Sequence, residues 1–162
     1  MLLSGAARER GPEGWGRGLQ HRITRQTTES LADTLEDGVR DIVGRTIQVV
    51  TGPPLREKFT RTPALGVYMY RVAVRPKRRE EQPTLTCQIT RDGVISEFYR
   101  DPPMLVNLDY LVSAWADEEP EQQELLGAAM RVLLEYPVLE GERLDGDAFD
   151  PEERIPVRPV EE

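Results

Sequence analysis

A predominantly apolar segment from Ala64 to Val74 constrains the fold more than any other feature of the sequence. Alternate positions carry apolar or aromatic residues toward both sides of the segment, and Pro76 ends it. Strands that are apolar on both faces are typical of the centre of a sheet that is covered on both sides. The segment therefore predicts a central, doubly covered strand over these residues.

Two other segments have the apolar periodicity of helices. The first runs from about Ser30, a suitable N-cap, to Val43, and Gly44 ends it because glycine tolerates the left-handed cap. The second starts near Pro120, which suits a first helical turn. The apolar stripe predicted for this second helix consists of Leu125, Leu126, Ala129, Met130, Leu133 and Leu134.

The remaining strands are shorter or less regular. Residues 46–50 predict a short strand, and residues 84–90 and 94–99 predict a hairpin, because Asp92-Gly93 allows the positive φ angles of a tight turn. Residues 104–115 predict a further strand of dense apolar content. The order of elements predicts an α+β domain in which two main helices flank a mainly antiparallel sheet.

Composition divides the chain into three parts. Residues 1–29 are rich in glycine and arginine without periodicity and predict an N-terminal arm, with Trp15 and Leu19 as apolar anchors. Residues 30–144 hold the α+β domain, with Leu144 as its last core residue. Residues 145–162 are acidic and proline-rich, which predicts an extended C-terminal tail.

The residue types needed for catalysis are scarce, and we expect no enzyme, no cofactor and no metal site. His21 is the one histidine and lies in the arm, without a partner for nucleophilic catalysis. Cys87 is the one cysteine, so an intrachain disulfide is impossible, and we interpret it as a buried strand residue. Asp145, Asp147 and Asp150 only faintly match a calcium loop, since the following glutamate comes too early.

The net charge of −8 disfavours a nucleic-acid partner, which requires a concentrated basic surface. No stretch approaches a membrane span and the start is unlike a signal peptide, so we expect a cytoplasmic protein. One basic cluster follows the central strand and is either a solvated loop or a contact with an acidic neighbour, such as the tail of the next copy. This cluster consists of Arg75, Lys77, Arg78 and Arg79.

Two sequence blocks resemble the N-terminal domain of cap, or tail terminator, proteins of phage-tail-like contractile injection systems. The first is Val67-Tyr-Met-Tyr-Arg-Val72. The second consists of Leu108-Asp-Tyr-Leu111, an acidic linker, Leu125-Leu-Gly127 and Pro137-Val-Leu139. The resemblance covers residues 30–144, lacks a second aromatic residue after Asp109, and offers no counterpart for the arm.

The resemblance implies a structural subunit without catalysis. Six copies would form a ring on the last layer of inner tube and sheath at the distal end of the particle, with sheath and tube proteins as partners. Two alternatives stay open: a baseplate or tube adaptor, or phage head-tail connector, and a small ligand-binding domain. The latter would need a polar cluster inside a pocket, which the sequence does not offer.

Overall fold

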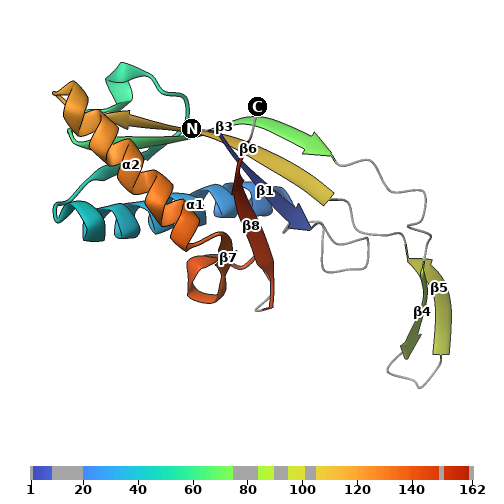
Figure 1. Cartoon of the computed structure of the whole chain (residues 1–162). Helices are drawn as coiled ribbons and strands as arrows, with labels where there is room; N and C mark the ends of the chain where they lie inside the picture. Colours follow the sequence, from blue (N-terminus) through green and yellow to red (C-terminus); the bar gives the residue numbers. More distant parts are fainter. Residues whose placement is uncertain are drawn as a thin grey trace.

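The computed structural model describes residues 2–8, 20–74, 84–89, 95–100, 105–149 and 152–160. These residues form two helices, a six-stranded sheet and a separate two-stranded ladder (Figure 1). The elements are β1 Leu2–Arg8, α1 Gln20–Val43, β2 Gln48–Thr51, η1 Arg56–Lys58, β3 Ala64–Val74, β4 Thr84–Ile89, β5 Ile95–Arg100, β6 Leu105–Trp115, α2 Glu119–Glu135, β7 Val138–Glu140, η2 Gly141–Arg143 and β8 Arg154–Pro159.

The large sheet has the strand order β2-β3-β6-β1-β8-β7. Its neighbouring strands are antiparallel except for β2 and β3, which run parallel. β4 and β5 pair with each other in antiparallel register, as the predicted hairpin requires, and the turn between them lies outside the described residues. The predicted α+β class with a mainly antiparallel sheet is confirmed.

The core lies between both helices and one face of the large sheet. The strand register places the buried sheet residues on that face: Leu65, Val67, Val106, Leu108, Tyr110, Val112, Leu139, Ile155 and Val157. Leu35 and Val39 of α1 and Leu125 and Ala129 of α2 belong to the same buried cluster. Both helices therefore stabilise the fold by covering one side of the sheet.

The prediction that the first helix begins near Ser30 is wrong, because α1 begins at Gln20. Ser30 is buried inside the helix instead of capping it. The turns before Ser30 bury the polar residues Gln26 and Thr27, and the hydroxyl of Thr27 donates to the carbonyl of Ile23 at 2.7 Å. A hydroxyl that donates to the carbonyl four residues earlier in the helix can be buried without being apolar. Such residues do not contribute to the apolar periodicity from which a helix is predicted.

Both ends of the chain contribute strands to the sheet, which the sequence analysis did not predict. β1 lies between β6 and β8, and β8 also pairs with β7. Ile155 and Val157 of β8 are buried, so Leu144 is not the last core residue. The short β8, which contains Pro156 and Pro159, and the Gly- and Ala-containing β1 have weak strand preferences. Pairing between these two strands and with their neighbours in the sheet decides their conformation.

The prediction that β3 is covered on both faces is correct only for the first half of the strand. On the face away from the helices, the ring of Phe59 stacks on Trp115 with centroids 4.4 Å apart. Gly66 makes room for this pair, because a Cβ there would lie 2.9 Å from Phe59 and 2.6 Å from the Ser113 hydroxyl. In the second half of β3, Tyr70 and Val72 are exposed, which contradicts the prediction.

The two helices approach each other closely at Gly38 of α1. A Cβ built on Gly38 would lie 2.7 Å from both methyl groups of Val132 in α2. The α2 residues that face this contact and the sheet are Leu125, Ala128, Ala129, Val132 and Leu133. Met130 and Leu134, predicted in the buried stripe, are instead exposed, because the small side of α2 turns toward α1.

Replacing Gly38 by alanine is expected to lower the free energy of unfolding by up to about 2 kcal/mol. Overpacking against the stiff, β-branched Val132 costs about 1–3 kcal/mol, and the better helix propensity of alanine offsets about 1 kcal/mol. Urea unfolding followed by circular dichroism measures the difference.

The companion substitution Val132→Ala removes the methyl groups that the new Cβ would meet. We expect the double variant to lose less stability than the sum of the two single variants, because the two methyl contacts are removed and only the contact with the Cβ of residue 132, at 3.3 Å, remains. Strictly additive losses, or a gain in stability for Gly38→Ala alone, would contradict the close approach of the helices.

Candidate interaction surface

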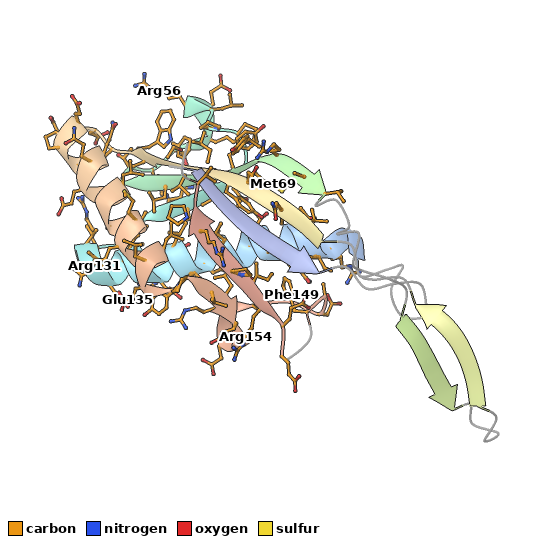
Figure 2. All side chains as sticks on the ribbon, turned by 45° about the vertical axis from the view of Figure 1, so that its right-hand side comes forward. Arg56, Met69, Arg131, Glu135, Phe149 and Arg154 are labelled. Atoms are coloured by element: carbon orange, nitrogen blue, oxygen red, sulfur yellow. The ribbon has the colours of Figure 1, made fainter. Side chains whose placement is uncertain are left out.

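The pairing of β3 with β6 brings together the two sequence blocks that carry the family resemblance. Tyr68 lies opposite Leu111, and Arg71 lies opposite Asp109 in the register. A β-bulge interrupts this register between Met69, labelled in Figure 2, and Arg71, which leaves Tyr70 without a partner on β6. Bulges bend a strand and re-aim its side chains, so the two halves of β3 face different surroundings.

An ion pair joins the two blocks at the bulge. The Nε of Arg71 donates a hydrogen bond to Oδ2 of Asp109. The side chain of Asp109 is only 3% exposed, whereas that of Arg71 is 64% exposed. The guanidinium covers a buried carboxylate from the solvent side, on the sheet face away from the helices. Buried carboxylates need such a partner because desolvation disfavours an isolated charge.

The electrostatics of this pair favour a structural role. The hydrogen bond to Asp109, and then the charge of that carboxylate, raises the pKa of Arg71. The guanidinium therefore keeps its proton until strongly alkaline pH and cannot act as a general acid or base near neutrality. What the pair can do is hold β3 and β6 together where the bulge disrupts their ladder.

The second half of β3 has a free edge among the described residues. β2 pairs with β3 only at Ala64–Val67, after which the Gly52 amide donates to the Val67 carbonyl at 2.9 Å and the chain turns away. The exposed residues that follow are Tyr70 at 42%, Val72 at 52% and Val74 at 59% exposed. We call these three residues and the unpaired side of their strand the β3 edge. Exposed apolar residues beside an unpaired strand make this edge a candidate binding surface.

The pair β4 and β5, called here the β4–β5 ladder, is the other prominent feature. Both figures show it standing apart from the helices and the large sheet (Figures 1 and 2). It is joined in sequence to the end of β3 and the start of β6. Cys87 lies within β4 as predicted, opposite Glu97, and the burial predicted for it lies outside what the structure describes.

The acidic segment after η2 packs on α1. Ser30 accepts a hydrogen bond from the Asp145 amide at 3.0 Å, and the Gln26 amide donates to Asp147 at 2.8 Å. Arg22 pairs with the other oxygen of Asp147 at 2.9 Å. The hydrogen bond from Gln26, supported by Arg22, lowers the pKa of Asp147. The main-chain amide of Asp145 and the carboxylate of Asp147 therefore hold this loop on α1. The sequence analysis placed both residues in the C-terminal tail.

Most residues singled out for binding by sequence lie outside the described part of the chain. These are Arg75, Lys77, Arg78, Arg79, Trp15, Leu19 and Asp150. Their contacts remain predictions. His21 lies in α1, and its side chain is outside what the structure describes.

The sequence analysis did not predict the ion pair of Arg71, although Arg71 lies in the first block of the family resemblance, residues 67–72. A signal existed, because Asp109 stands between Leu108 and Tyr110 in a strand of apolar content. A charge at such a position predicts a cation on a neighbouring strand, since buried charges are almost always paired.

Among the described residues, no three histidine, cysteine or acidic side chains lie close enough together to hold a metal ion. Neither described helix is long and apolar enough to cross a membrane.

Comparisons with known proteins identify one family. The sequence model of the family described as "Pvc16 N-terminal domain" matches residues 26–162. The match includes α2, the β4–β5 ladder and most of α1, and it leaves β1 outside. Neither a curated protein nor a solved structure was found to match the chain.

Proposed function

Because the chain belongs to the Pvc16 N-terminal domain family of structural components of the Photorhabdus virulence cassette, a contractile injection system, we propose that it is the cap of such a particle. In this role it ends the inner tube and holds the last sheath layer in its extended state. Its partners are further copies of the same chain in a ring of six, the tube protein and the sheath protein. The ring assembles in the cytoplasm at the distal end of the particle.

The observation that carries this proposal is the β3 edge, which no described strand pairs with, beside the Arg71–Asp109 pair. A cap must bind a growing polymer end without offering a new site for the next subunit. An exposed strand edge with apolar residues supplies a binding surface made of main-chain and side-chain groups. The ion pair fixes the geometry of that strand, so the surface is preorganised.

Two segments outside the described residues, one basic and one with apolar anchors, are proposed to supplement this surface. The basic cluster of residues 75–79 and the arm residues Trp15 and Leu19 stay proposed contacts with neighbouring subunits. The described loop after η2 is held on its own α1 by Ser30 and Gln26, so an acidic partner for the cluster would come from another surface.

Electron microscopy of particles from cells that lack the protein tests the proposal. We expect tubes of uncontrolled length or sheaths that contract early, with both defects reversed by the wild-type gene. An antibody or gold label on the complementing protein should mark the end opposite the baseplate. Full-length, contraction-competent particles from cells that lack the protein would refute the cap function. A label at the baseplate would favour the adaptor function.

A further inference from the structure

The β4–β5 ladder lacks a third strand among the described residues. Its six register pairs run from Thr84 opposite Arg100 to Ile89 opposite Ile95. Both views show it apart from the helices and the large sheet (Figures 1 and 2). A lone two-stranded ladder is marginally stable in water unless a further strand or a packed surface supports it. The ladder therefore needs support from outside the described body of its own chain.

The residues of the ladder divide by face. The register puts Leu85 opposite Tyr99, Cys87 opposite Glu97 and Ile89 opposite Ile95, and alternation places these six positions on one face. The other face holds Thr84, Thr86, Gln88, Ser96, Phe98 and Arg100. One face is thus mainly apolar and the other mainly polar, which is the pattern of a sheet that is covered on one side only.

The β3 edge lacks a partner strand among the described residues, just as the ladder lacks a third strand. Among the described residues, β6 pairs with one side of β3 along its length, whereas the other side has β2 only as far as Val67. Tyr70, Val72 and Val74 are exposed beside this open side. An added strand would satisfy the open main-chain groups, and its side chains would lie beside those of Val72 and Val74 on the face that these share with Leu108 and Val106.

We propose that the β4–β5 ladder of one copy adds to the β3 edge of a second copy, so that subunits join head to tail. The two surfaces differ, and each copy carries one of each, so the contact is heterologous and repeats until a ring closes. In a closed ring every ladder has a support and every β3 edge has a strand. This balance favours a second copy over a different protein, which would leave one of the two surfaces open.

The inference deepens the proposed function by stating how the ring forms, and it is tested on the purified full-length chain. One variant disables the edge with Val72→Lys and Val74→Lys, since lysine on an edge strand opposes strand addition. A second variant disables the apolar face of the ladder with Ile89→Lys and Ile95→Lys. Mass photometry and light scattering measure the assembly of each variant alone and of the two mixed.

We expect the wild type to form rings and each variant alone to be monomeric, its self-association weakened by roughly tenfold or more. The equimolar mixture should give a dimer, because one intact ladder meets one intact edge and the next contact is missing. The matched control Met130→Lys with Leu134→Lys places the same change on exposed residues of α2 and should leave rings intact. Circular dichroism confirms that all variants are folded.

Rings from either variant, or a mixture that stays monomeric while the wild type forms rings, would overturn the inference. A wild-type chain that stays monomeric at every accessible concentration would overturn it as well. That outcome leaves the cap function standing, because a cap can assemble on the tail end itself. Conversely, rings with the expected mixing behaviour but particles of normal length without the protein would refute the cap and retain the head-to-tail contact.

Discussion

Replacing Arg71 by methionine is expected to destabilise the protein more than replacing its partner Asp109 by asparagine. The first change leaves the carboxylate of a side chain that is 3% exposed without its cation. An unpaired carboxylate at the Asp109 position costs about 2–4 kcal/mol, somewhat less than in a fully buried pair because water reaches the Arg71 side. Asparagine keeps an oxygen that accepts from Arg71, so we expect a loss of only about 1 kcal/mol there.

Urea unfolding followed by Trp115 fluorescence measures both losses. The double variant Arg71→Met with Asp109→Asn should be more stable than Arg71→Met alone, because no buried charge remains. Equal losses for the two single variants, or a double variant less stable than both, would contradict a buried carboxylate that depends on Arg71.

The wild-type protein is expected to lose about 2–3 kcal/mol of stability through Tyr110 as the pH rises from 10 to 12. Burial raises the pKa of Tyr110 to about 12, from an ordinary value of 10.0. Below pH 10 the tyrosine is neutral in both states, and its contribution is fully present. Above pH 10 the unfolded chain loses the phenolic proton first, which favours unfolding until the folded state also ionises near pH 12.

The variant Tyr110→Phe provides the control for other groups that titrate in this range. Thr28 donates to the Thr24 carbonyl at 2.9 Å, so the Tyr110 hydroxyl donates in its 2.9 Å contact with Thr28. Losing this hydrogen bond should cost about 1 kcal/mol at neutral pH. The difference in the free energy of unfolding between wild type and variant should shrink and then reverse above pH 10. A difference that does not depend on pH would refute the role of Tyr110.

Local signals in the sequence predicted several elements well. The bounds of β3 agree with the predicted segment from Ala64 to Val74. Gly44 ends α1 with a φ of 73°, and its amide bonds to the Arg40 carbonyl at 2.9 Å. Apolar runs, prolines and glycines act over a few residues, so each of these boundaries can be read from neighbours in sequence.

Long-range pairing could not be predicted in the same way. β1 and β8 are strands because Leu3 lies opposite both Tyr110 and Pro159, and no local pattern specifies these partners. The extra turns of α1 depend on polar side chains satisfied by the loop at Asp145 and Asp147. The β3 edge could not be predicted either, because it depends on where β2 stops pairing with β3. Among the described residues, that pairing ends at Val67.

The antiparallel arrangement of β1 and β6 also determines how the protein would carry mechanical tension. β6 follows the β4–β5 ladder in the chain and begins at Leu105, which lies opposite Arg8 of β1. Leu2 lies at the other end of the β1–β6 pair, opposite Leu111. Tension between the ladder and Leu2 would pull the two strands along their length and strain all seven register pairs at once. Tension between Leu3 and its partner Pro159 would instead peel β1 from β8 one pair at a time. The same sheet is thus strong along the line from ladder to N-terminus and weak between the chain ends.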